Sequence, residues 1–122
     1  MAVNVLIADD LAFIKIVLRD ILEKSGFRVV AEASNGDEAI ARYLDTRPDV
    51  VLMDITMPGM DGLTALRRIR ELDPAARVII CSAIGQQRLI QQAIEMGARD
   101  FIVKPFQPQR VVSALKKALD IS

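Results

Sequence analysis

The sequence predicts an α/β domain built on a mostly parallel sheet, and three observations lead to this fold class. Five short apolar runs, rich in β-branched residues, alternate with helical patterns along the chain. These runs are almost continuously hydrophobic, as expected for strands that are buried on both faces. The length of 122 residues suits one ordinary domain, so a single sheet should carry any functional site.

The N-terminal part contains two predicted strands, residues 3–8 and 28–33, each followed by a helical pattern. The first helix ends near Gly26. The second covers about residues 37–44 and ends where Arg47 precedes a proline, because a residue before proline disfavours helical backbone angles. Apolar residues at helical spacing are predicted to face the core: Ile14, Val17, Leu18, Ile21, Leu22, Ile40, Tyr43 and Leu44.

The rest of the chain repeats the strand and helix pattern three times. In chain order its elements are predicted at residues 50–53, 63–72, 78–81, 86–95 and 101–103, with a last helix from Pro108. Proline suits the first position of a helix, where its missing N–H is not needed. The residues predicted to face the core are Leu66, Ile69, Leu89, Ile90, Ala93, Ile94, Val111, Val112, Leu115 and Leu119.

Composition excludes several classes of function. The 16 basic and 16 acidic residues cancel, so the chain lacks the basic charge typical of a nucleic-acid or membrane-surface binder. Histidine is absent, which rules out Ser-His-Asp triads and histidine-ligated metals. The single Cys81 lies in an apolar run and is read as a buried hydrophobe. No signal peptide or apolar run of about 18 residues occurs, so a cytoplasmic protein is expected.

Polar side chains follow four of the five apolar runs. The first run is followed by Asp9 and Asp10, the third by Asp54, the fourth by Ser82 and the fifth by Lys104. Because the carboxyl ends of parallel strands meet at one edge, these groups should lie together. Asp10 or Ser82 alone could instead cap the following helix. Two adjacent aspartates cannot both be the cap, and a long loop separates Asp54 from the next helix, so the combined pattern favours a site.

This set of side chains favours phosphoryl transfer. Three clustered carboxylates repel one another, and Mg²⁺ relieves this while leaving coordination positions for phosphate oxygens. Lys104 offers a positive charge to a phosphoryl oxygen and Ser82 offers a hydroxyl donor. Asp54, at the end of the expected central strand, is the natural nucleophile, since a carboxylate can accept a phosphoryl group.

The same residues carry a resemblance that spans the whole chain. The ordered motifs are Asp9-Asp10, Asp54 with Met57-Pro58-Gly59-Met60-Asp61-Gly62, Ser82-Ala83, and Phe101 with Lys104-Pro105. Together they resemble the receiver domains of two-component response regulators, and most of all the stand-alone chemotaxis receivers of thermophile type. The resemblance implies a flavodoxin-like fold with five parallel strands in the order 2-1-3-4-5 and helices on both faces.

The resemblance also implies a role for each site residue. Asp54 would be phosphorylated by a histidine kinase, and Asp9, Asp10 and the backbone carbonyl of Thr56 would complete a Mg²⁺ site with it. Lys104 would contact the phosphoryl group, and its bond to the following proline is expected to be cis. Ser82 and Phe101 would form a switch pair. Without the resemblance, Phe101 would be read as an ordinary core aromatic.

Two positions depart from the pattern best known in enteric bacteria. Thr56 stands where an asparagine is common, and Ile84 stands where a polar or acidic residue is common. Both positions flank the path of the water that hydrolyses the acyl phosphate in the family. We therefore expect bulky Ile84 to slow dephosphorylation unless a phosphatase assists. Phe101 replaces a frequent tyrosine, which removes a hydroxyl from the output surface.

The resemblance predicts two protein partners. The flagellar motor switch protein would bind the face formed by the fourth helix, the fifth strand and the last helix, to which Arg88, Arg99, Arg110, Lys116 and Lys117 add positive charge. The histidine kinase would dock near Phe13 and Ile14 of the first helix. The chain is expected to act as a monomer. It is not expected to be an enzyme in the usual sense, although it would catalyse its own phosphorylation and slow dephosphorylation.

Three other functions remain open from the sequence. A phosphorelay intermediate of the sporulation type would share every site residue. A Mg²⁺-dependent phosphohydrolase with an aspartyl-phosphate intermediate would usually need an acidic residue where Thr56 stands. A receiver-like binding module that is not phosphorylated is disfavoured, because no member of the acidic and lysine set is missing.

Overall fold

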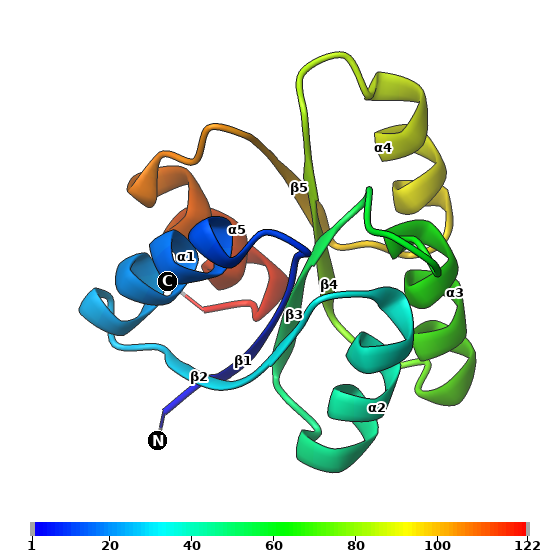
Figure 1. Cartoon of the computed structure of the whole chain (residues 1–122). Coiled ribbons are helices and arrows are strands. Elements are labelled where there is room, and N and C mark those ends of the chain that lie inside the picture. Colours follow the sequence, from blue (N-terminus) through cyan, green and yellow to red (C-terminus); the bar gives the residue numbers. More distant parts are fainter. Residues whose placement is uncertain (1, 122) are drawn as a thin grey trace.

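Residues 2–121 are described by a computed structural model with five strands and five helices in strict alternation (Figure 1). The strands are β1 (Asn4–Ala8), β2 (Arg28–Ala33), β3 (Val50–Asp54), β4 (Val78–Ser82) and β5 (Asp100–Val103). The helices are α1 (Ala12–Lys24), α2 (Gly36–Thr46), α3 (Gly62–Leu72), α4 (Gln87–Glu95) and α5 (Pro108–Ala118). The predicted α/β class is confirmed, and the predicted boundaries differ by one or two residues.

The five strands form one parallel sheet in the order β2-β1-β3-β4-β5, as the resemblance implied. The strand β3 is central, and Asp54 is its last residue. The chain proceeds from β1 to β2 on one side and from β3 to β5 on the other, so the order reverses between β1 and β3. Ligands of open parallel sheets bind beyond the carboxyl ends of the strands at such a reversal.

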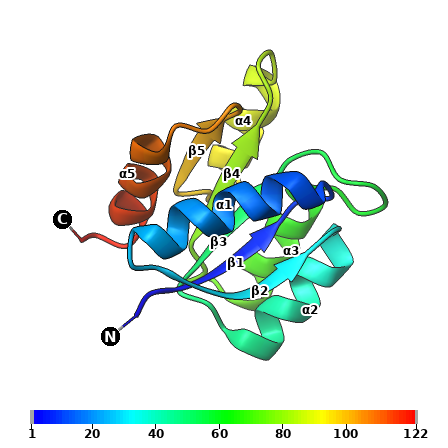
Figure 2. The same ribbon diagram turned by 60° about the vertical axis from the view of Figure 1, so that its left-hand side comes forward.

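Helices cover both faces of the sheet, as Figures 1 and 2 show. The helices α1 and α5 pack on one face, and α2, α3 and α4 pack on the other, which gives two separate hydrophobic cores. Along β3 the side chains alternate between them: Val50 and Leu52 enter the core of α1 and α5, whereas Val51 and Met53 enter the other. All four are fully buried. Burial of such side chains is worth about 1.5–3 kcal/mol each, so the strand that ends in Asp54 is firmly anchored.

Gly62 allows α3 to begin close against the end of β3. A Cβ atom at this position would lie 1.9 Å from the backbone carbonyl oxygen of Asp54, so no larger residue fits without displacing that strand end. The preceding Asp61 caps the helix, because its side chain accepts a hydrogen bond from the Thr64 amide at 2.8 Å. This close approach explains why glycine follows the loop after Asp54.

Two core predictions were wrong. Leu44 on α2 and Ile94 on α4 are 42% and 43% exposed. Each follows a buried residue, Tyr43 or Ala93, and the next position lies about 100° further round a helix. The apolar faces are therefore narrower than the sequence suggested. Cys81 is buried as predicted, and this burial raises the pKa of its thiol. Among residues 2–121, no helix is long and apolar enough to span a membrane.

Candidate functional site

The predicted site residues meet at the carboxyl edge of the sheet. Asp54 and Ser82 are the last residues of β3 and β4, and Asp9 and Lys104 directly follow β1 and β5. The backbone N–H of Lys104 donates to the carbonyl of Ser82 at 2.8 Å, which holds the ends of β5 and β4 together. The ends of four strands therefore lie at one edge, as the sequence predicted, and the side chains of Asp9, Asp54 and Lys104 meet there.

Three aspartates form a compact acidic cluster. One carboxylate oxygen from each of Asp9, Asp10 and Asp54 lies within 4.8 Å of the others. Asp9 and Asp54 are almost completely buried, whereas Asp10 is exposed. The Asp9 side chain also accepts a hydrogen bond from the Leu11 amide at 2.9 Å, which fixes its orientation. The cluster thus has two rigid inner carboxylates and one outer carboxylate open to solvent.

Lys104 bridges the two buried carboxylates. Its Nζ lies 3.1 Å from Oδ2 of Asp9 and 3.2 Å from Oδ2 of Asp54. Its peptide bond to Pro105 is cis, as the resemblance implied. In this position the ammonium group can contact an anion that is attached to Asp54.

The electrostatics of the pair follow from burial and proximity. Burial and the nearby charge of Asp9 raise the pKa of Asp54 above its ordinary value, although Lys104 opposes both. Burial would lower the pKa of Lys104, but the hydrogen bond to Asp9 and the charge of Asp54 outweigh it and raise that pKa. Among the described residues Lys104 is the one cation paired with this cluster of three carboxylates, so the site is short of positive charge.

Ser82 carries an unsatisfied buried hydroxyl. Its Oγ is buried and has no hydrogen-bond partner among the residues that the structure describes. Such a group is costly unless something else completes it, and a ligand is one explanation. The capping interpretation is wrong for both Asp10 and Ser82, because Leu11 and Gln86 are the N-cap residues of α1 and α4.

Thr56 and Gln86 border the same site. The Thr56 amide donates to Oδ1 of Asp54 at 3.3 Å, and the carboxamide of Gln86 donates to Oγ1 of Thr56 at 3.1 Å. Thr56 is among the site residues predicted from the sequence, whereas Gln86 is not. Its position four residues after Ser82 gave no separate signal, because a glutamine in a polar loop is usually solvated.

Phe101 and Ile84 line the same hollow. Both line a hollow of about 300 Å³ together with Ile90 and Val103, on the side of α4 and β5. Phe101 is half-buried and Ile84 is 80% exposed. The ring of Phe101 therefore lies beside open space, which a switch residue requires. Ile84 points largely into solvent in this state.

Arg110 has a structural role that the sequence analysis missed. Its guanidinium binds the buried carboxylate of Asp100 through two hydrogen bonds of 3.2 and 3.0 Å and donates to the Phe101 carbonyl at 2.6 Å. Burial would raise the pKa of Asp100, but these hydrogen bonds and one from the Phe101 amide hold it below its ordinary value. The guanidinium of Arg110 is therefore already paired with groups of the same domain and offers little free positive charge to a partner.

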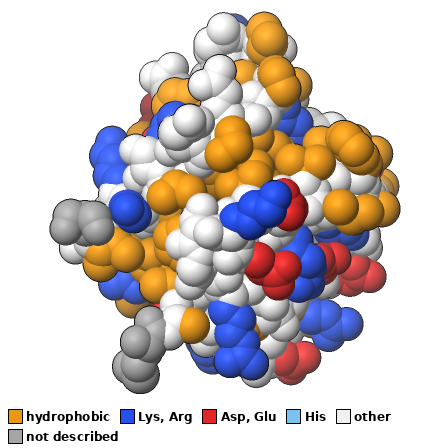
Figure 3. Space-filling model, turned by 90° about the vertical axis from the view of Figure 1, so that its left-hand side faces the viewer, with side chains coloured by type: hydrophobic (Ala, Val, Ile, Leu, Met, Phe, Trp, Pro, Cys, Tyr) orange, Lys and Arg blue, Asp and Glu red, His pale blue; other side chains and the backbone are white. Residues whose placement is uncertain are grey.

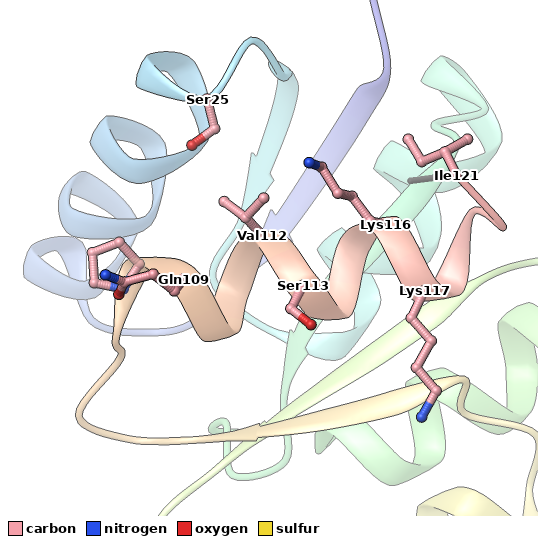
Figure 4. A pocket seen from close by; sticks show the side chains of 8 residues that line it. Ser25, Gln109, Val112, Ser113, Lys116, Lys117 and Ile121 are labelled. Carbon is pink, nitrogen blue, oxygen red and sulfur yellow. The ribbon is translucent and has the colours of Figure 1, made fainter.

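The face of α4, β5 and α5, predicted to bind the motor switch protein, is called the output face here. Its other basic residues do not pair with carboxylates as Arg110 does. Arg88, Arg99, Lys116 and Lys117 make no ion pair among the described residues. Figure 4 shows Lys116 and Lys117 leaving α5 in opposite directions, with Lys117 on the side of β5. They line a shallow groove of about 680 Å³ with Ser25, Val112 and Ile121. Lys116 therefore belongs to the α1 side of α5 more than to the predicted face.

The exposed end of α1 is apolar. Phe13 is 72% exposed and Ile16 is 66% exposed, and Leu11 beside them is also exposed. Figure 3 shows the side of the molecule that carries α1 and α5, where hydrophobic side chains form patches across the middle and toward the right of the view. Phe13 therefore has no packing reason to be aromatic, and its exposure is the condition on which the predicted docking role depends.

The donor set suits a hard divalent cation and a phosphoryl group. Carboxylate oxygens are ligands that Mg²⁺ prefers, and Mg²⁺ typically leaves positions for phosphate oxygens. The unsatisfied Ser82 hydroxyl and the bridging Lys104 provide two donors for such oxygens. The arrangement can therefore place an anionic group on Asp54 and neutralise its charge.

Comparison with known proteins agrees with this geometry. Residues 5–116 match the family described as response regulator receiver domain. The chain is 55% identical over 120 residues to the chemotaxis protein CheY of Bacillus subtilis, covering 98% of this chain and 100% of that protein. It is 54% identical to CheY of Thermotoga maritima, covering 96% and 98%. A solved structure of a CheX-CheY-BeF3-Mg complex from Borrelia burgdorferi superposes with a TM-score of 0.90 at 40% identity, covering 93% and 87%.

Proposed function

The chain belongs to the response regulator receiver domain family, and from this membership we propose that it takes a phosphoryl group on Asp54 in a chemotaxis pathway and passes the signal to the flagellar motor switch protein. One observation carries the proposal. Lys104 bridges Asp9 and Asp54, and the partnerless hydroxyl of Ser82 lies at the same sheet edge. A phosphoryl group on Asp54 would supply the acceptor that the Ser82 hydroxyl lacks and a further anionic partner for Lys104.

The transfer step needs positioning more than acid or base chemistry. An oxygen of the Asp54 carboxylate attacks the phosphorus of the phosphohistidine on the kinase. The new P–O bond forms as the P–N bond breaks, and the electron pair remains on the imidazole nitrogen, which takes a proton from solvent. In the structure the Thr56 amide and Lys104 contact the two oxygens of Asp54 at 3.3 and 3.2 Å, which orients the carboxylate for this step.

Asp9, Asp10, Asp54 and the Thr56 carbonyl are the proposed Mg²⁺ ligands. The bound ion would offset the negative charge that accumulates on the phosphoryl oxygens. Without such an ion, the three neighbouring carboxylates would oppose the approach of an anionic donor. Asp9 is suited to an inner position because it is buried and oriented by the Leu11 amide.

Ser82 and Lys104 also couple the site to the output face. Both stand at the ends of the strands that lead to α4 and α5. A ligand shifts a two-state equilibrium only through contacts that differ between the states. The Ser82 hydroxyl gains a partner only when the phosphoryl group is present, and Phe101 lies beside a hollow that an inward rotation could fill.

Two surfaces serve the partners. The apolar end of α1, with Phe13 and Ile16, is the proposed docking site for the histidine kinase. The face of α4, β5 and α5 presents Arg88, Arg99 and Lys117 beside apolar residues, which suits an acidic amphipathic segment of the motor switch protein. The Borrelia CheY structure is a complex with CheX, and we propose a partner of that kind for this chain.

Phosphorylation with a small phosphodonor and Mg²⁺ tests the acceptor assignment. Mass spectrometry should find one phosphoryl group on Asp54, and Asp54→Asn should abolish it. Asp61→Asn is the matched control, because asparagine also caps a helix well and Asp61 is exposed. Modification that persists in Asp54→Asn would overturn the assignment. Binding of a motor-switch peptide that does not strengthen with beryllofluoride and Mg²⁺ would refute the chemotaxis output.

A further inference from the structure

The side chain of Gln86 connects two loops at the edge of the site. Its Oε1 accepts a hydrogen bond from the Ala83 amide at 2.7 Å, and its Nε2 donates to Oγ1 of Thr56 at 3.1 Å. Ala83 belongs to the loop after β4 and Thr56 to the loop after β3. One carboxamide therefore uses both its acceptor and its donor to join these loops.

Strand register places this connection directly beyond the acceptor. Asp54 pairs with Cys81 across β3 and β4, so Thr56 and Ala83 each lie two positions past that pair. Thr56 also contacts Asp54, through its amide and Oδ1 at 3.3 Å. Ala83 directly follows Ser82, whose hydroxyl is buried without a partner. Gln86 thus holds the neighbour of the acceptor and the neighbour of the unsatisfied donor.

We propose that Gln86 is a latch that holds the loop after β4 in its unphosphorylated position and is released when Asp54 is phosphorylated. The inference rests on the proposed function of Asp54. A phosphoryl group that reaches the Ser82 hydroxyl comes beside the adjacent Ala83 amide. Its charged oxygen is a stronger acceptor than the neutral carboxamide of Gln86, because charge-assisted hydrogen bonds are roughly twice as strong. The Ala83 N–H then donates to the phosphoryl oxygen instead of Oε1 of Gln86, and the Gln86 side chain no longer holds Ala83 in place.

Release of the latch would affect the output side directly. Gln86 is the N-cap residue of α4, and its carbonyl accepts the Ile90 amide at 3.0 Å. It also lines the hollow that Phe101 and Ile84 share. Once the Ala83 N–H has changed partner, the Gln86 carboxamide keeps only its bond to Thr56. The segment from Ala83 to Gln86 can then move, which changes the shape of this hollow. Gln86 is therefore a positioning residue that connects the charge on Asp54 to the surface of α4 and β5.

The neighbouring Gln87 provides a matched control. It is the same residue type, one position later, and it is exposed at the first position of α4. Among the described residues its side chain makes no hydrogen bond to the protein. Gln86→Ala and Gln87→Ala therefore remove the same atoms from the same helix end, but only the first removes the latch.

The experiment titrates the wild type and both variants with beryllofluoride in excess Mg²⁺ and records NMR spectra. Gln86→Ala should bind beryllofluoride about twofold to tenfold more tightly, the range expected when one competing hydrogen bond is removed. In the free protein, Gln86→Ala should also speed the hydrogen exchange of the Ala83 amide. In the wild type, the side-chain amide resonances of Gln86 should shift on beryllofluoride binding, whereas those of Gln87 should not. Gln87→Ala should match the wild type throughout.

Three results would overturn the latch. Unchanged beryllofluoride affinity in Gln86→Ala would show that the carboxamide does not compete. Weaker affinity would show that Gln86 is a ligand of the phosphoryl group. Failure of the wild type to bind beryllofluoride would remove the proposed function of Asp54, and the latch with it. The first two results leave Asp54 as acceptor, so the failures are distinguishable.

Discussion

The side chains of Lys104 and Asp54 meet 50 positions apart in the sequence, with Nζ of the lysine 3.2 Å from Oδ2 of the aspartate. The same ammonium group lies 3.1 Å from Asp9. It therefore occupies, in the unphosphorylated protein, part of the negative region that a divalent cation would also neutralise. Competition between the lysine and the cation leads to the first prediction.

Lys104→Met should strengthen Mg²⁺ binding and weaken beryllofluoride binding. Removal of one positive charge leaves the three carboxylates freer for Mg²⁺, and we expect an increase in affinity of about tenfold, or roughly 1.4 kcal/mol. Beryllofluoride loses the ammonium group as a direct hydrogen-bond donor, so its affinity should fall by about tenfold or more. Calorimetric titration measures both. Lys24→Met, which removes only an exposed pair with Asp20, is the control. Weaker Mg²⁺ binding in Lys104→Met would contradict this account.

Ile84→Glu should change the rate at which the phosphorylated protein loses its phosphoryl group. The Ile84 side chain is 80% exposed, so the variant should fold like the wild type. A carboxylate at this position can orient water, and a severalfold faster hydrolysis is expected. The rate is measured after removal of the phosphodonor, with Ile94→Glu on α4 as a control at another exposed isoleucine. An unchanged rate in Ile84→Glu would dismiss the hypothesis that Ile84 restricts water.

Phe13→Ala should slow phosphotransfer from the kinase while leaving phosphorylation by a small donor unchanged. The ring is 72% exposed, so the free energy of unfolding should change by less than about 0.5 kcal/mol. Loss of an exposed aromatic anchor usually weakens docking by about tenfold or more. Leu72→Ala on α3, at a residue 54% exposed, serves as the control. Equal slowing by both variants would place the kinase elsewhere.

Arg110→Met should lower stability in a pH-dependent way. The hydrogen bonds from Arg110 keep the pKa of Asp100 in the folded protein below its ordinary value. The stabilisation is therefore fully present above the pKa of an aspartate in the unfolded chain, about 3.9. It is lost as the pH falls through the lower pKa that Asp100 has in the folded protein. The variant should be about 1 kcal/mol less stable at neutral pH, a modest value because the Arg110 side chain is 42% exposed.

Urea unfolding at several pH values measures this difference, which should shrink below about pH 4. Arg42→Met removes an exposed pair with Asp45 and should show no such convergence. A constant difference between wild type and Arg110→Met at all pH values would argue that Arg110 stabilises the fold by packing alone.

Gly62→Ala should disturb both the fold and the metal site. The added Cβ would meet the Asp54 carbonyl oxygen at 1.9 Å, and relief of this overlap should cost about 1–3 kcal/mol and move the carboxylate. Mg²⁺ affinity should fall as well. Gly26→Ala has open space but a left-handed φ of 87°, so it should lower stability without affecting Mg²⁺. Unchanged Mg²⁺ affinity in Gly62→Ala would show that the strand end tolerates the shift.

Much of the fold and the acidic site could be predicted because their signals are local in the sequence. Apolar runs followed by Asp9, Asp54 and Lys104 identify strand ends, and parallel strands bring their ends to one edge. The exposure of Leu44 and Ile94 could not be predicted in this way. Helical periodicity gives the direction of an apolar face, whereas its width depends on how closely the neighbouring helices pack.

The sequence by itself determined the α/β class, the acidic cluster and the position of Asp54, Ser82 and Lys104 at the ends of strands. Only the tertiary structure decided which polar side chains already have hydrogen-bond partners. Arg110 is bound to Asp100, Gln86 joins Thr56 to Ala83, and the Ser82 hydroxyl has no partner among the described residues. The physical reason is that a hydrogen bond forms only when donor and acceptor are placed to within a few tenths of an ångström. Residue types and their spacing in the sequence do not specify the relative positions of loops and strands that precisely.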